Sequence, residues 1–329
     1  MKNNKEFLTY NKQMKHLRNE KNILCNGLKD KEVLCRIGYF NLINGYKNPF
    51  VVSAVNGVHS YFTGTSVNDL YNLKKFDDEF RLLLFKYITQ IEEEIRTITA
   101  YKFDEVNDNG KITWYQLNAY DTTRDIPKVV KTISRVYNEI DRADQDYIRF
   151  YLEQHNTIPT WVMVKIIQFY TLINFINSSK LSVKRAISSL YGILDSRGNP
   201  DFKLLVGSLH WLRTVRNSCA HNERIFTITD KNSRIYTNYM NSLAPSYSRE
   251  RDKKIIDLLV YMKYYLPENE YNTLMMNVEA LLTDLSSVIH SQAFSRVLAA
   301  LGVKNINHIS LLRLATKQTP INYCIFEKM

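Results

Sequence analysis

The segment RTVRNSCAHNERIF, residues 213–226, holds the side chains of this sequence that are best suited to chemistry. Arg216 and His221 lie five positions apart, and Asn217 directly follows the arginine. An unperturbed histidine titrates near ~6.5, so it can accept or donate a proton at neutral pH. An arginine stays charged and offers a planar fork of donors that fits a phosphate group. The trio predicts proton transfer beside a phosphate, and the alternative is a charged helix end with a histidine near its cap.

The helix that carries this segment places the three side chains on different faces. We expect it to run from Phe202 to about His221, with one apolar stripe facing the core. At ~100° per residue, Asn217 and His221 stack on the polar side, away from that stripe. Arg216 falls near the middle of the stripe itself. Arg216 and His221 therefore do not form a site on a single face of the helix.

An arginine on a core-facing stripe needs a partner, because burying its charge alone costs several kcal/mol. The sequence offers one in IEEEIR, residues 91–96, on an earlier helix. Glu92 flanks the apolar stripe of that helix and forms an i, i+4 pair with Arg96. We predict that Glu92, supported by Arg96, helps to hold Arg216 or its neighbours in place; the alternative is that Arg216 lines a polar cavity.

His221 and Asn217 face away from their own core, and the surface of one helix offers no pocket for a substrate. A site at this position would therefore need completion by a second molecule. The alternative is a solvated polar face without a function of its own.

Composition favours a packed helical protein with a polyanionic partner. Apolar residues make up 45% of the 329 positions, and only 10 Gly and 7 Pro interrupt them, which indicates an all-α fold. The net charge of +11 favours nucleic acid as a partner, although a basic chain can also lack a specific one. The polar, charged first residues do not predict a secretory signal, and the sequence holds no apolar run of ~20 residues and no CxxC pair. We predict a cytoplasmic chain with no membrane partner, no metal site and no cofactor.

The hydrophobic pattern divides the chain into elements that must position the motif. Helices are expected over 5–28, 70–103, 128–152, 159–176, 202–221 and, in pieces broken at Pro267, 251–317, with a hairpin or ordered loop within 49–65. Ser66 and Asp69 form a potential capping box for the long helix, and DDEFR, residues 77–81, is expected to be its charged first part rather than a metal site. We expect an N-terminal elaboration over 1–65, a helical core over 66–230 and a C-terminal helical extension over 231–329, packed on the core.

At RNSCAH, residues 216–221, the sequence resembles the Rx4–6H motif of ribonucleases of the HEPN superfamily. The longer RNSCAHNERIF resembles the corresponding segment of the Abi-like abortive-infection proteins of bacteria, the AbiD/AbiF type. Three further segments resemble that family in the expected order: LCRIGYFNLINGYKNPF, FTGTSVNDLYNLKKFDDEFRLLLFKYITQIEEEIR and IPTWVMVKIIQFYTLINFI. Two positions depart from the family pattern. Lys165 stands where an acidic residue is usual, and Asn222 where a second histidine often follows the motif.

The resemblance implies a HEPN-like helical bundle that forms a homodimer and cleaves RNA without a metal, to limit phage infection or as a toxin. It implies catalytic roles for Arg216, Asn217 and His221, and RNA contacts for the flanking Arg213 and Arg224. It also implies, as a possible partner, a small non-coding RNA or another antitoxin. The alternatives are a catalytically silent HEPN-type protein that holds such an RNA, and a structural helical module.

Overall fold

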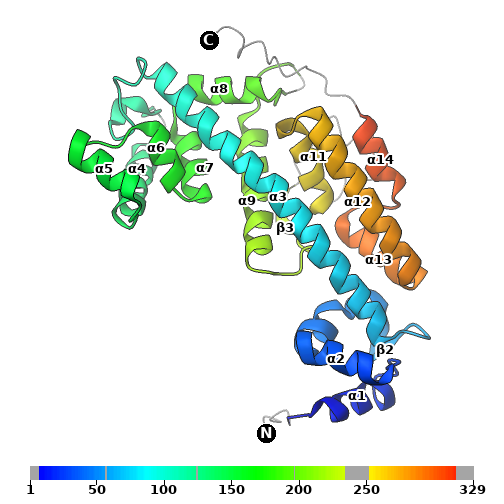
Figure 1. Ribbon diagram of the computed structural model, residues 1–329. Helices are drawn as coiled ribbons and strands as arrows, with labels where there is room; N and C mark the ends of the chain where they lie inside the picture. The colour runs from blue at the N-terminus through cyan, green and yellow to red at the C-terminus, as the bar shows by residue number, and fades with distance from the viewer. Residues whose placement is uncertain (1–6, 56–57, 124, 196, 234–251, 316–329) are drawn as a thin grey trace.

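One long helix, α3 (Val67–Val106), is the axis of the molecule, and the other elements pack along it (Figure 1). The structure is a computed structural model, and it describes residues 7–55, 58–123, 125–195, 197–233 and 252–315. The 40 residues of α3 span about 60 Å at the helical rise. The predicted capping box begins it: the Asp69 N–H donates to Ser66 Oγ at 3.2 Å, and the Ser66 N–H donates to Asp69 Oδ2 at 2.8 Å.

The N-terminal elements gather around the first turns of α3 (Figure 1). They are α1 (Tyr10–Asn19), α2 (Gly27–Ile37), the π-helix η1 (Phe40–Asn44), the 3-10 helix η2 (Asn48–Phe50) and the antiparallel strands β1 (Val51–Val55) and β2 (Val58–Tyr61). The predicted hairpin is therefore present. A continuous helix over 5–28 was a wrong expectation, because α1 ends at Asn19 and the chain turns through Asn22, whose φ is +51°.

The middle of the chain forms shorter helices around the C-terminal half of α3 (Figure 1). They are the 3-10 helix η3 (Leu117–Ala119), α4 (Ile126–Asp141), α5 (Asp146–His155), α6 (Thr160–Ile166), α7 (Phe169–Ser178) and α8 (Leu181–Leu190). Two single helices that the pattern predicted, over 128–152 and 159–176, are each two helices in the structure.

The break between α6 and α7 is stabilised by two side chains from elsewhere in the fold. Glu139 on α4 accepts from the Gln168 N–H and from Thr171 Oγ1, both at 2.6 Å. Arg96 on α3 donates to the carbonyl of Ile167 at 2.6 Å and to that of Val164. Because these tertiary contacts satisfy the free backbone groups at both helix ends, an apolar stretch that favours one helix folds as two.

The motif helix is α9 (Phe202–Ala220), and it packs against α3, α7, α8 and α11. Asp201 begins it by accepting from the Leu204 N–H at 2.9 Å. The remaining elements are the short strands β3 (Asp230–Ser233) and β4 (Asp252–Lys253) and the helices α11 (Ile255–Tyr265), α12 (Glu268–Val288), α13 (Ser291–Leu301) and α14 (Asn307–Leu314). Pro267 separates α11 from α12, as predicted.

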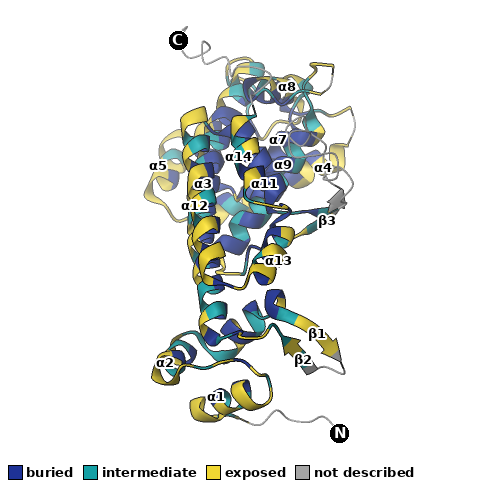
Figure 2. Cartoon of the chain, turned by 90° about the vertical axis from the view of Figure 1, so that its right-hand side faces the viewer, coloured by how far each residue is buried: buried dark blue, intermediate teal, exposed yellow. Residues whose placement is uncertain are grey.

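The expected all-α architecture is confirmed, with two small two-stranded sheets in the described part of the chain. Buried residues line the contacts of α3 with α9 and α12, and exposed residues cover the outer faces (Figure 2). Helix α12 packs on α3 and α11 on α9, while α14 packs on α12, and α13 on α12 and η2. The division into segments 1–65, 66–230 and 231–329 stays a prediction. In the part of the chain that the structure describes, no helix combines the length and apolar character that crossing a membrane requires.

Candidate functional site at the end of helix α9

Helix α9 ends at the motif histidine. His221 is the C-cap, and its N–H donates to the carbonyl of Asn217 at 2.9 Å. Its imidazole is exposed to solvent, as the helical wheel predicted. Asn222 then takes a left-handed φ of +58°, a conformation that asparagine tolerates well, and the chain leaves the helix axis. Ser218 Oγ donates to the Glu223 carboxylate at 2.8 Å, which closes the turn around the histidine.

The backbone after His221 is held by a carboxylate on α3. Asp77 is fully buried and accepts from the Phe226 N–H at 3.0 Å, the Ile225 N–H at 3.2 Å and the Tyr46 hydroxyl at 3.0 Å. Arg81, one turn later, lies 3.6 Å from Asp77 and donates to the carbonyl of Glu223 at 3.0 Å. Burial raises the pKa of the Asp77 carboxyl, and its hydrogen bonds oppose that shift.

Sequence reasoning missed this anchor, since it treated DDEFR only as the charged start of a helix. A signal was present. Asp77 lies three residues before Phe80 and seven before Leu84, so the wheel places it on the buried stripe of α3. A carboxylate in that position needs donors, and here the donors are backbone N–H groups of the chain that follows the motif.

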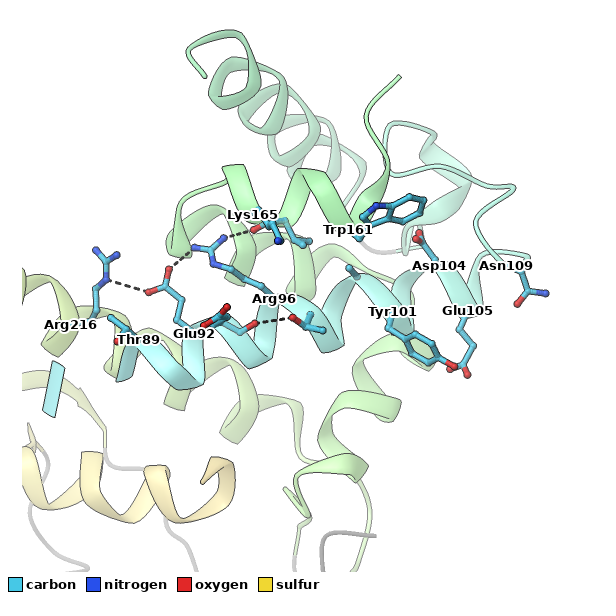
Figure 3. Close-up of a pocket in the computed structure, with 14 residues that line it drawn as sticks. Thr89, Glu92, Arg96, Tyr101, Asp104, Glu105, Asn109, Trp161, Lys165 and Arg216 are labelled. Atoms are coloured by element: carbon cyan, nitrogen blue, oxygen red, sulfur yellow. Dashed lines mark hydrogen bonds and ion pairs between the residues drawn. The ribbon is translucent and has the colours of Figure 1, made fainter. Parts of the chain in front are cut away.

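The predicted contact between Glu92 and Arg216 is present (Figure 3). Arg216 Nε lies 3.2 Å from Glu92 Oε2, and the other oxygen of Glu92 accepts from Arg96. No hydrogen bond of good geometry joins Arg216 Nε to the carboxylate, so the contact is an ion pair with a misaligned N–H. Glu92 is buried between the two arginines, while about a third of the Arg216 side chain stays exposed. Arg216 therefore reaches the edge of the core rather than its centre.

Arg216 faces a small cavity of about 390 Å³ that α3, the break between α6 and α7, and α9 enclose. Arg213 and Asn217 from the motif helix line it, as do Lys165 and Tyr170. The guanidinium carbons of Arg213 and Arg135 lie 5.0 Å and 4.9 Å from the centre of the Tyr170 ring. The hydrogen bond from Arg135 lowers the pKa of the Tyr170 hydroxyl. The cavity is thus dominated by cationic donors, and Arg213 Nε is buried in it without a hydrogen-bond partner.

His221 lines a different cavity, of about 560 Å³, on the side of the N-terminal elements. The charged and amide side chains around it include Arg36, Asn41, Lys74, Asp78, Glu223 and Arg224. The guanidinium of Arg224 is engaged there, since it donates to the carbonyl of Gly45 and to Thr227 Oγ1 at 2.8 Å. The structure therefore brings Arg216, Asn217 and Arg213 together with Glu92 and Arg96, but it places His221 and Arg224 in a separate cavity.

Among the residues that the structure describes, no three His, Cys, Asp or Glu side chains are arranged to hold a metal ion. Cations outnumber carboxylates in both cavities: the cavity at Arg216 holds four cations and Glu92, and the cavity at His221 holds three cations, the imidazole, Asp78 and Glu223. Such linings suit an anionic ligand and proton transfer.

Fold and site define an all-α protein that carries an Arg–Asn–His set at the end of a buried helix, with the arginine held by a glutamate from a long neighbouring helix. The chain belongs to the Abi-like protein family, whose model matches residues 32–227. The match begins in α2 and ends directly after the Asp77-bound residue Phe226, so it includes both cavities and leaves α11 to α14 outside. The family expected from the sequence is confirmed, and it suggests a function in abortive infection. No curated protein and no solved structure matches the chain.

Proposed function

We propose that this protein is a metal-independent endoribonuclease of the HEPN type, which acts in abortive infection or as a toxin. The observation that carries the proposal is the end of α9, where Arg216 is oriented by the buried Glu92 and His221 is left exposed at the helix C-cap. Family membership supports the biological setting, and the net charge of +11 supports a polyanionic substrate. We propose that it cleaves its RNA substrate in the cytoplasm.

The proposed chemistry is transphosphorylation by the 2′-hydroxyl of RNA. An imidazole removes the proton from the 2′-hydroxyl, the oxygen attacks the adjacent phosphorus, and the bond to the 5′ oxygen breaks. A second imidazole returns a proton to that 5′ oxygen. Arg216 stabilises the charge on the phosphorane, and Asn217 orients the phosphate or the ring. The products would carry 2′,3′-cyclic phosphate and 5′-hydroxyl ends.

The need for two imidazoles and the separation of the two cavities both favour a homodimer. Within one chain, Arg216 and His221 line different cavities, and one chain supplies a single motif histidine. A second chain that places its own motif against the first would supply the missing acid or base. We therefore propose that the active site is composite, with Arg216, Asn217 and His221 contributed by both chains.

Cleavage of RNA by wild type and by His221→Ala and Arg216→Ala tests the proposal. With EDTA present, we expect wild type to cleave and His221→Ala to lose about 10²- to 10⁴-fold in rate, the size of a general acid–base contribution. The matched control is His155→Ala, which removes an exposed histidine that also ends a helix, α5. A requirement for Mg²⁺, or products with 3′-hydroxyl and 5′-phosphate ends, would contradict the mechanism.

A silent RNA-binding protein is the second candidate, and the cationic cavity around Arg213 and Arg216 favours it equally well. Retained RNA binding without cleavage by the wild-type protein would support that candidate. Its ligand would then be a small non-coding RNA or an antitoxin RNA, which co-purification and sequencing of bound RNA would identify.

A further inference from the structure

The cavity at Arg216 continues into a longer groove between α3 and α6 (Figure 3). The groove measures about 1020 Å³, and it shares Glu92, Arg96, Lys165 and Arg216 with the smaller cavity. Twelve residues of α3 separate Glu92 from Asp104, so the lined length is about 18 Å at the helical rise. That length exceeds a single nucleotide. The groove extends away from the proposed catalytic residues.

The two ends of the groove differ in chemistry. Arg216 lies at one end, Tyr101, Trp161 and Asp104 lie toward the other, and Lys165 lies between them (Figure 3). Arg216 and Lys165 suit phosphate oxygens, while Glu92 pairs with Arg216 and Glu93 also lines the groove. The other end offers ring faces, together with carboxylate and amide groups that accept hydrogen bonds from ribose hydroxyls and base amino groups. One groove thus presents partners for both halves of a nucleotide.

Trp161 is exposed in a way that the other tryptophans are not. Its exposed fraction is 57%, against 2% for Trp114 and 0% for Trp211, and these three are all the tryptophans of the chain. It lies in the first turn of α6, and Tyr101 of α3, which is 45% exposed, lines the same groove. Large rings at the wall of a polar groove are suited to stack on an unpaired base, which contributes about 1–3 kcal/mol per base.

We infer that this groove binds a single-stranded segment of RNA, with a base stacked on Trp161 and the neighbouring phosphate held by Lys165, which lies one helical turn later on α6. The inference rests on the proposed function for the identity of the nucleic acid, and it adds a subsite some nucleotides away from the bond that is cut. Double-stranded RNA keeps its bases stacked on each other, so it cannot use this subsite.

Intrinsic tryptophan fluorescence tests the subsite directly, because a single tryptophan is accessible. The His221→Ala chain is titrated at low salt with a mixed-sequence RNA octamer, so that the RNA stays intact. We expect the single strand to quench the emission, and the same octamer in a duplex to leave it unchanged. The Trp161→Phe change in the same chain should remove the response. Equal quenching by strand and duplex, or quenching that persists without Trp161, would overturn the inference.

Affinity gives the second measurement. Anisotropy of a labelled octamer should show binding about 5- to 150-fold weaker for Trp161→Ala, the equivalent of one lost base stack. The control is Phe7→Ala, which removes an exposed ring that precedes α1 and does not line the groove. Unchanged affinity in Trp161→Ala would overturn the subsite.

The two proposals can fail separately. Quenching by single-stranded RNA without any cleavage by the wild-type chain would support the groove and contradict the nuclease. Cleavage by the wild-type chain, with no quenching and with the same cut sites in Trp161→Ala, would support the nuclease and overturn the groove.

Discussion

Glu92 contacts two arginines, Arg96 and Arg216, which have different roles. Arg96 donates to it and to the carbonyls at the end of α6, and Arg216 extends from it to the cavity edge. Because the carboxylate is buried, its charge is tolerable only with both cations beside it. The glutamate thus fixes the direction of Arg216 and, through Arg96, the path of the chain between α6 and α7.

We predict that Glu92→Gln lowers the free energy of unfolding by about 1–3 kcal/mol, measured by urea denaturation. Removing one partner of a fully buried ion pair destabilises a protein by more than this. Here the cost is smaller, because the partly exposed Arg216 side chain can be solvated instead. The matched control is Glu93→Gln, the same change at the exposed neighbouring position, which should leave the free energy of unfolding nearly unchanged. Equal stabilities of the two variants would show that Glu92 does not hold the arginines.

At the scale of elements, the motif depends on a contact between α3 and the loop that follows α9. Asp77 of α3 accepts from the N–H groups of Ile225 and Phe226, and Arg81 of α3 donates to the carbonyl of Glu223. The position of His221 is therefore set by a helix that lies about 140 residues earlier in the chain.

We predict that Asp77→Ala destabilises the fold by about 2–5 kcal/mol, because two buried backbone N–H groups lose their acceptor and each costs about 1–3 kcal/mol. Thermal or urea unfolding measures the effect. Glu79→Ala, which removes an exposed carboxylate two residues later, is the control and should have little effect. If Asp77→Ala is as stable as the control, the loop is held by other contacts.

At the scale of the whole molecule, we propose that the site is shared between two copies of the chain. The motif lies at the junction of the N-terminal elements, α3 and α9, and each chain carries one exposed motif histidine. A composite site with two imidazoles is inactive when either chain lacks its histidine.

We therefore predict that excess His221→Ala chain, refolded or co-expressed with wild type, suppresses cleavage by drawing wild-type chains into inactive mixed dimers. RNA is kept in large excess, so that competition for substrate does not contribute. The control is the same excess of His155→Ala chain, which should add activity rather than remove it. Undiminished wild-type cleavage in the presence of His221→Ala would indicate that each chain works alone.

The sequence by itself determined two kinds of feature: the elements with a strong local signal, and the contact between Arg216 and Glu92. The capping box at Ser66 and Asp69 and the exposure of His221 follow from the sequence, because helix periodicity and capping depend on neighbours within a few residues. So does the pairing of Arg216 with Glu92, since a charge on a core-facing stripe must find an opposite one.

Only the tertiary structure decided where helices break and which cavity each motif residue lines. The split of residues 159–176 depends on Glu139 and Arg96, and the turn after His221 depends on Asp77, all distant in the sequence. The groove that leads to Trp161 also forms only when α3 and α6 pack together. Local sequence patterns do not predict such partners, because the backbone groups at a helix end can bond with any side chain that the fold brings near.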